Sequence, residues 1–469
     1  MRQNHYSIVK LKMKIALYVH CFFPTHYHGT EAYTLALAKN LQAMGHEPVV
    51  VSCNFQDNKK TDGLITQYDY QGIPVYCIDK NYIRHTSLKE LYYQPQMLEV
   101  HKNLLQELQP DIVHVTHLIN HTAALLDALD ELAIPAIATF TDFFGFCLNG
   151  KLEAADGSLC AGPNPQRTNC FACAAKGGVR RVISRGKRQT ISTLGELALC
   201  RIAPLIKLGC SCYNLIYRLP GLRSSRLSLL LSGIKERPEF LAKRYGLYRA
   251  VIAPTRFLCS AYEKNGLTKA PIHQINFGVD LDRKPKPIPP SSTPIRFGFI
   301  GQLAPHKGTA LLVEAFCRLP TGNCELHIYG AEDQSPEYTQ TMKTRCTNFA
   351  VFFRGTFPSG QMRQVLDEVD ILVIPSTWYE NSPLVLLHAL ASHTPVIVSD
   401  VEGLTEFLDQ GKNGLDFERG SIDDLERVMR KILANPDSSR QLSLTTNYVK
   451  TTKSMTEEVV KIYDAILAK

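Results

Sequence analysis

The stretch ILVIPSTWYENSPLVLLHALASHTPVIVS, residues 371–399, contains two short apolar runs separated by a helical segment. Residues 371–374 and 395–399 are continuously apolar instead of alternating with polar residues, which is typical of strands buried on both faces of a parallel sheet. Between them, a polar loop runs into a leucine-rich segment that predicts a helix. The stretch therefore predicts a strand–helix–strand unit of an α/β protein.

The same alternation of apolar runs and helical periodicity extends along the chain. After the apolar run at residues 15–19, Tyr33, Leu37 and Leu41 recur at every fourth position, as on the buried side of a helix. Further short segments that read as strands, most of them rich in apolar residues, lie at residues 15–19, 48–52, 111–115, 134–139, 250–254, 273–277, 296–300, 325–329 and 351–353.

A proline- and lysine-rich stretch, residues 283–294, interrupts the series and is too stiff and polar to pack. The fold expected is two Rossmann-like, doubly wound α/β domains, residues 13–282 and 295–440, on either side of this linker. The first domain carries a cysteine-rich and basic helical insert at about residues 147–237.

The composition is that of a soluble globular protein, with 469 residues, of which 45% are hydrophobic and 20% charged. The first 12 residues lack the apolar core of a signal peptide, and the start is left open between Met1 and Met13. No run approaches the roughly 18 apolar residues of a membrane span. With 14 cysteines but no export signal, we expect a cytoplasmic protein without a disulfide framework.

Two such domains place the expected active site in the cleft between them, because ligands bind beyond the carboxyl ends of parallel strands. Neither residues 20–31, after the first strand, nor the loop after Ile300 contains a G-x-G-x-x-G sequence. The absence of this phosphate-binding loop argues against a dinucleotide cofactor.

The loop at residues 375–384 has residue types that suit a sugar phosphate. A carboxylate at a strand end, Glu380, can accept hydrogen bonds from sugar hydroxyls. The turn at residues 381–384 offers backbone N–H groups where the helix dipole favours phosphate. Taken alone, the segment also fits an ordinary loop between a strand and a helix.

Residues 375–389 resemble the donor-binding block of the family 4 retaining glycosyltransferases of GT-B fold, in which seven residues separate two glutamates. Four more segments resemble motifs of that family in the same order. They are the first glycine-rich loop (24–31), the Asn-Gly-Val-Asp segment (276–280), the glycine/lysine loop (301–308) and the Gly-x-x-Glu segment (399–406). The resemblance covers most of the chain outside residues 151–236.

The resemblance implies retaining transfer of a sugar from a nucleotide-sugar, a UDP- or GDP-sugar, to an acceptor hydroxyl. The acceptor would be a saccharide or a lipid-linked molecule in polysaccharide or glycolipid assembly, with no catalytic metal and no nucleic acid partner. The second domain would bind the donor, and residues 441–469 would form a helix that crosses back to the first domain.

The resemblance also implies roles for individual residues. Lys307 would neutralise the donor diphosphate, Glu380 would hold sugar hydroxyls, and the loop at Asp142 would direct a carboxylate into the cleft. The expected catalytic residues are Lys307, Glu380 and Asp142, and the expected donor-binding residues are Gly29, Gly301, Gln302, Lys307, Glu380, Asn381, Ser382, Pro383, Leu384 and His388.

Three positions depart from the family pattern. His388 replaces the second glutamate, and a neutral histidine accepts one hydrogen bond where a carboxylate accepts two. This leaves open altered nucleoside binding or lost catalysis, the latter giving a nucleotide-sugar-binding or scaffold module. Gln302 replaces a frequent arginine, and Thr141 replaces the histidine of a His-Asp pair. His114 and His117 are then candidates for contacting the sugar or acceptor, or else structural histidines.

The insert carries two further features. Cys147, Cys160, Cys170 and Cys173 follow Asp142, and the Cys-Phe-Ala-Cys pair has zinc-knuckle spacing, so we expect a structural zinc or else four reduced thiols. Residues 180–237 alternate leucines with basic residues, which fits helices at an anionic membrane surface or helices packed in the core. The first alternative would place the protein at the inner face of the membrane.

Overall fold

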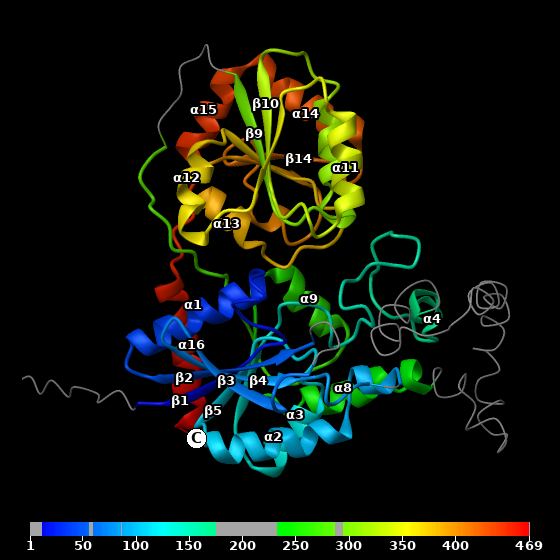
Figure 1. Cartoon of the computed structure of the whole chain (residues 1–469), viewed down its shortest axis with the longest axis vertical. Helices are drawn as coiled ribbons and strands as arrows, with labels where there is room; N and C mark the ends of the chain where they lie inside the picture. The colour runs from blue at the N-terminus through cyan, green and yellow to red at the C-terminus, as the bar shows by residue number, and fades with distance from the viewer. Residues whose placement is uncertain (1–11, 56–59, 86, 175–231, 287–293, 469) are drawn as a thin grey trace, which may run out of the picture.

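The computed structural model describes residues 12–55, 60–85, 87–174, 232–286 and 294–468, and shows two α/β lobes, one above the other (Figure 1). The first lobe is built on an eight-stranded sheet of order β3-β4-β2-β1-β5-β6-β7-β8. Its strands are β1 Lys14–Tyr18, β2 Glu47–Asn54, β3 Ile65–Tyr70, β4 Ile73–Asp79, β5 Ile112–Val115, β6 Ala136–Thr139, β7 Ala250–Ala253 and β8 Ile272–Gln274. All pairs are parallel except the β3–β4 hairpin.

The second lobe has a six-stranded, fully parallel sheet of order β11-β10-β9-β12-β13-β14. Its strands are β9 Ile295–Ile300, β10 Cys324–Tyr329, β11 Val351–Gly355, β12 Ile371–Ile374, β13 Val396–Ser399 and β14 Gly414–Phe417. Its helices are α10 Thr309–Phe316, α11 Pro336–Arg345, α12 Met362–Asp367, α13 Leu384–Ala391, α14 Ile422–Ala434 and α15 Pro436–Thr445. The expected fold class, two doubly wound α/β domains, is confirmed.

Helices cover both faces of the first sheet, and this explains its uninterrupted apolar strands. Ala16 and Tyr18 of β1 lie in the core on one face, and Ile15 and Leu17 lie in the core on the other. The helices of this lobe are α1 Gly29–Ala43, α2 Pro95–Leu108, α3 Ala124–Glu131, α4 Thr168–Cys173, α8 Arg237–Tyr245, α9 Arg256–Lys264 and α16 Thr452–Leu467. Because both faces exclude water, neither set of alternate positions is polar.

The last helix, α16, belongs to the first lobe although it follows the second lobe in sequence (Figure 1). Met455, Val459 and Tyr463 lie in the same buried cluster as Leu37 of α1. Leu387, from α13 of the second lobe, joins this cluster as well. The two lobes are therefore connected by packed side chains in addition to the linker.

The basic helical insert expected at residues 180–237 falls mainly on residues 175–231, which lie outside the described residues, and so does its expected membrane contact. Among the helices that are described, none combines the length and apolar character needed to cross a bilayer.

Candidate active site

Glu380 and Lys307 form an ion pair in the second lobe. Glu380 lies on the loop between β12 and α13 with 6% of its surface exposed. Its Oε1 atom accepts hydrogen bonds from Ser376 Oγ at 2.5 Å, Lys307 Nζ at 2.7 Å and Trp378 Nε1 at 3.0 Å. Burial opposes ionisation, but Lys307 and the two other donors outweigh it and lower the pKa of Glu380. The structure therefore holds a fixed, ionised carboxylate beside a cation.

Two glycines allow the loop that carries Lys307 and the loop that carries Glu380 to lie against neighbouring backbone. Gly308 follows Lys307 with φ of 73°, and a Cβ there would lie 1.8 Å from the carbonyl oxygen of Pro375. Gly403 has φ of 84°, and a Cβ there would lie 1.6 Å from the carbonyl oxygen of Glu380. Only glycine fits either position without moving the backbone. These contacts fix the loops after β9, β12 and β13 against one another.

Several buried polar atoms close in sequence to Lys307 and Glu380, or on α13, have no hydrogen-bond partner. They are Thr309 Oγ1, Asn381 Oδ1, Ser382 Oγ and His388 Nδ1. Helix α13 lacks a side-chain cap, whereas in α9 Thr255 caps the Leu258 N–H. The first turn of α13 carries no acidic residue either. Buried polar groups are ordinarily satisfied, so this concentration of unpaired atoms is what a polar ligand would complete.

His388 lies on α13 with a neutral imidazole. Burial is the main effect and lowers its pKa to about 4, while nearby Asp280 and Arg283 act in opposite directions. The unpaired Nδ1 atom can make one hydrogen bond to a ligand. Its expected contact with the donor ribose stays a prediction.

Side chains from both lobes meet beside the ion pair. Asn381 Nδ2 donates to the carbonyl oxygen of Thr141 at 3.1 Å, and Gln302 Nε2 lies 3.3 Å from the His28 ring. Gly29 begins α1 next to His28, and no atom lies within 4 Å of a Cβ placed there. The expected donor residues Gln302 and Asn381 thus face the first lobe directly.

Four titratable side chains form a row in the first lobe. His117 Nε2 lies 3.2 Å from Asp142 Oδ2, the His117 and His20 rings are 4.2 Å apart, and His20 Nε2 is 3.4 Å from Glu31 Oε1. Burial raises the pKa of Asp142 and outweighs the opposing effect of His117. Burial likewise raises the pKa of Glu31 to about 7. His114 is separate: it hydrogen-bonds to Tyr463 and Thr139 inside the core.

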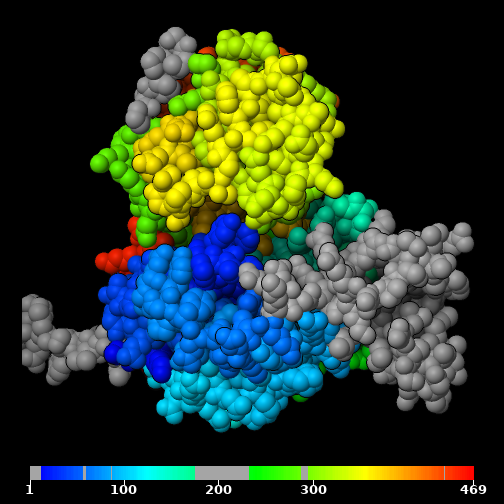
Figure 2. Space-filling view, in the orientation of Figure 1, coloured from blue at the N-terminus to red at the C-terminus, as the bar shows by residue number. Residues whose placement is uncertain are grey.

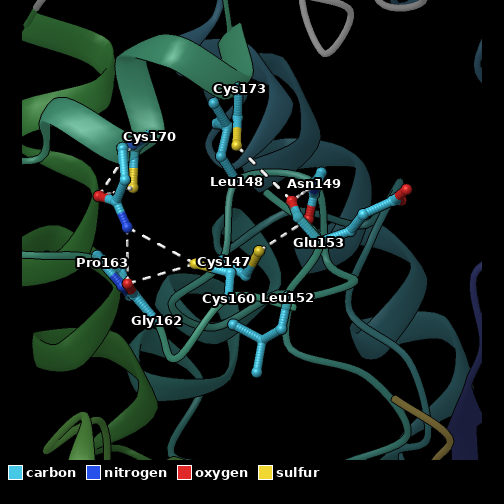
Figure 3. Close-up of a pocket in the computed structure, with 11 residues that line it drawn as sticks. Cys147, Leu148, Asn149, Leu152, Glu153, Cys160, Gly162, Pro163, Cys170 and Cys173 are labelled. Carbon is cyan, nitrogen blue, oxygen red and sulfur yellow. Dashed lines mark hydrogen bonds between the residues drawn. The ribbon is translucent and has the colours of Figure 1, made fainter. Parts of the chain in front are cut away.

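The four cysteines of the insert line one small cavity (Figure 3). In this structure their thiols bond to nearby oxygens, and within the described residues no three His, Cys, Asp or Glu side chains converge at metal-binding distance. In this conformation the four thiols do not form the expected zinc site.

Sequence reasoning did not assign roles to Trp378, Gly403, Glu31 or His20. Trp378 is the only tryptophan of the chain and lies inside the recognised block, so its uniqueness was a usable signal. Gly403 lies inside the Gly-x-x-Glu segment, but its contact with Glu380 depends on loops brought together by the fold. No local pattern indicated the row from Glu31 to Asp142.

Two doubly wound lobes joined by a linker are the architecture of the GT-B fold. Residues 280–447 match the family described as "Glycosyl transferases group 1", and residues 27–152 match "Glycosyltransferase Family 4". The chain belongs to these family 4, group 1 glycosyltransferases.

Individual relatives are distant. The alpha-maltose-1-phosphate synthase of Mycolicibacterium smegmatis is 28% identical over 176 residues, which cover 35% of this chain and 42% of the relative. This chain therefore spans less than half the length of that curated relative. Among solved structures, the sucrose-phosphate synthase of Thermosynechococcus elongatus has a TM-score of 0.60 at 15% identity, covering 97% of this chain and 100% of the other. Anabaena Alr3699/HepE in complex with UDP and glucose has a TM-score of 0.58 at 14% identity, with coverage of 97% and 100%. These two likenesses show the fold.

Proposed function

We propose that the protein transfers a sugar from a nucleotide-sugar, a UDP- or GDP-sugar, to an acceptor hydroxyl with retention at the anomeric carbon. The acceptor class proposed is a saccharide or a lipid-linked molecule of polysaccharide or glycolipid assembly. The observation that carries the proposal is the ionised Glu380–Lys307 pair, with unpaired buried polar atoms on Thr309, Asn381 and Ser382 close to it in sequence.

The donor diphosphate would lie between Lys307 and the start of α13. The ammonium group pairs with Glu380, four residues before α13 begins, and that helix has neither a capping side chain nor a first-turn acid. Charge builds on the diphosphate as the sugar leaves, and fixed positive groups stabilise that charge more in the transition state than in the ground state. No catalytic metal is needed in this arrangement, because the lysine and the helix N-terminus supply the positive potential.

Glu380 would bind hydroxyls of the transferred sugar. Its Oε1 atom already accepts the three bonds that fix its orientation, and Oε2 takes part in none of them. Asp142 and His117, from the first lobe, would lie on the acceptor side of the sugar. Cytoplasmic location and contact with an anionic membrane surface stay predictions that accompany this function.

Trp378 provides a direct test of donor binding. It is the only tryptophan, it donates to Glu380, and Lys307 Nζ lies 5.0 Å from its ring centre. A diphosphate that attracts Lys307 changes the surroundings of the indole, so UDP or GDP should change its fluorescence in a saturable titration. Released nucleotide from UDP-, GDP- and ADP-sugars, and the anomeric configuration of the product by NMR, complete the assay.

Lys307→Gln and Glu380→Gln should each reduce turnover on the order of 10²–10³-fold, the effect typical of removing one electrostatic contact to a transition state. Lys412→Gln is the matched control, because Lys412 forms an exposed 2.9 Å ion pair with Asp409 outside the site. A protein that binds no nucleotide and releases none contradicts the proposal. Binding without turnover favours the alternative, a GT-B scaffold that has lost catalysis at His388.

A further inference from the structure

The segment between β6 and α4 brings four thiols to one cavity of about 10 Å³ (Figure 3). Cys170 and Cys173 lie one turn apart on α4, and Cys147 and Cys160 flank a loop closed by an antiparallel bridge between Glu153 and Leu159. Asparagine and leucine side chains line the rest of the cavity, together with Glu153 and backbone from Gly162 and Pro163. The volume is about that of one water-sized sphere.

Each thiol is held by a contact that a metal would replace. Cys147 Sγ donates to Asn149 Oδ1 at 2.8 Å and Cys170 Sγ to Asn169 Oδ1 at 3.6 Å. Cys160 and Cys173 donate to backbone carbonyl oxygens at 3.5 Å and 3.7 Å. These bonds need the S–H proton, and a thiolate has no proton to donate. Loss of these protons therefore removes the donated bonds. Cys160 Sγ also accepts a bond from Asn169 Nδ2 at 3.6 Å, which the metal would displace.

A buried cation lies beside the thiols without a carboxylate partner. Arg237 is 3% exposed, its Nη2 donates to the Phe144 carbonyl oxygen, and its Nη1 has no hydrogen-bond partner. Within the described residues, no carboxylate lies at ion-pair distance from it. Burial lowers its pKa, and Tyr245, Cys147, Tyr92 and Cys170 counteract burial. The guanidinium also interacts electrostatically with Asp142 and lies 5.1 Å from the ring centre of Phe144. A buried guanidinium of this kind is costly unless negative charge is placed near it.

We propose that Cys147, Cys160, Cys170 and Cys173 bind one Zn²⁺ ion as a tetrahedral tetrathiolate site, with Arg237 as its buried counter-charge. Binding breaks four S–H bonds and releases four protons to solvent, and it forms four Zn–S bonds of about 2.3 Å. Four thiolates and one Zn²⁺ leave a net charge of −2, part of which Arg237 offsets.

Zinc fits this cavity better than a cluster or a hard cation does. Four sulfur ligands select a soft or borderline metal over Mg²⁺ or Ca²⁺. A cavity of about 10 Å³ holds a single ion, whereas an iron–sulfur cluster also needs room for inorganic sulfide.

The zinc would fix a loop that borders the proposed donor site. Within the segment that Cys147 and Cys160 delimit, Lys151 Nζ lies 4.6 Å from the ring centre of Trp378, and Leu159 packs against the buried cluster of the second lobe. The role is structural, because no cysteine of the set contacts Glu380 or Lys307. Zinc binding at this site does not require that the protein be catalytically active.

The test uses the full chain, purified under reducing conditions without chelator. Metal analysis should find one zinc per chain, and both Cys170→Ser and Cys173→Ser should lose it. Cys317→Ser, in the second lobe, is the matched control and should keep it. Cobalt substituted into the wild-type chain should give the d–d absorption of a tetrahedral site and thiolate-to-metal charge-transfer bands.

A second measurement on the wild type covers the case in which the variants do not fold. A chelator should make four additional thiols reactive, lower the melting temperature and change Trp378 fluorescence. A chain without zinc and with four freely reactive thiols overturns the proposal. So do two disulfide bonds among these cysteines, or bound iron in place of zinc.

Discussion

Asp142 lies in the first lobe and is proposed to contact the acceptor. Its carboxylate pairs with His117 in the first lobe, whereas Lys307 and Glu380 belong to the second. Asp142→Asn keeps the size of the side chain but removes its charge. We expect transfer to the acceptor to fall at least about tenfold, the lower range for a charged hydrogen bond to substrate.

The affinity for UDP or GDP, measured by Trp378 fluorescence, should stay the same in Asp142→Asn, because this residue is placed on the acceptor side. His117→Gln should reduce transfer less than Asp142→Asn does. An equal loss of donor affinity and transfer would assign Asp142 to donor binding instead.

Glu31 predicts a pH dependence of stability. Its side chain is 1% exposed, and burial raises its pKa to about 7 from the model-peptide value of 4.5. Between these pH values the native chain keeps a proton that the unfolded chain has released, so this group makes stability fall as pH rises from 4.5 to 7. Above that window the loss is constant, at up to about 3 kcal/mol.

Glu31→Gln removes this titration. Compared with the wild type, the variant should gain stability in denaturant unfolding at pH 8 and show a much smaller difference at pH 5. A stability difference that does not change with pH would show that Glu31 is ionised throughout this range in the native protein.

At the scale of elements, the loop after β13 positions Glu380 through Gly403. Gly403→Ala would introduce a Cβ 1.6 Å from the Glu380 carbonyl oxygen, so the two loops must separate. Gly411→Ala is the matched control, because Gly411 also has a positive φ, of 76°, but has no atom within 4 Å of the added Cβ.

Gly411→Ala should cost about 1–2 kcal/mol for the left-handed conformation alone. Gly403→Ala should cost a further 1–3 kcal/mol, roughly, for overpacking, and should also weaken nucleotide binding. Denaturant unfolding and the Trp378 titration measure the two effects. An equal loss of stability in the two variants would mean that the loops can separate at little energetic cost.

At the scale of the whole molecule, the two lobes are in contact beyond the linker (Figure 2). Glu406, in the second lobe, accepts hydrogen bonds from the backbone N–H groups of Arg256 and Phe257 at the start of α9, at 2.6 Å and 3.2 Å. Its carboxylate thus lies at the positive end of a helix of the first lobe. This contact gives the Gly-x-x-Glu segment a role in holding the lobes together.

Helix α16 predicts a coupling between the C-terminal residues and the stability of the first lobe. Met455 is 1% exposed and packs in the cluster of α1. Met455→Ala should destabilise the first lobe by about 2–5 kcal/mol, the range for large-to-small core substitutions. Lys461→Ala, on the exposed side of α16, should change stability by less than about 0.5 kcal/mol.

Calorimetry distinguishes the outcomes for Met455→Ala. A lower melting temperature for the first lobe, with Lys461→Ala unchanged, agrees with the packing. A wild-type transition in Met455→Ala would show that α16 contributes little to the stability of the first lobe.

The sequence by itself determined the fold class and the positions of the motif loops. Apolar runs and helical periodicity indicate which face of each helix or strand is buried. This pattern can be read from the residues of the element itself. Residues 371–399 could therefore be predicted as a strand, a loop and a helix before a second strand, and the structure has β12, α13 and β13 there.

Only the tertiary structure decided which side chains meet. Lys307 and Glu380 are 73 residues apart, and their 2.7 Å contact depends on β9 and β12 being neighbours in the sheet. Arg237 lies beside Cys147 because α8 packs against the loop after β6. Strand order and helix packing bring such partners together. A local sequence pattern does not predict these contacts, because residues far apart in the chain can be neighbours in the fold.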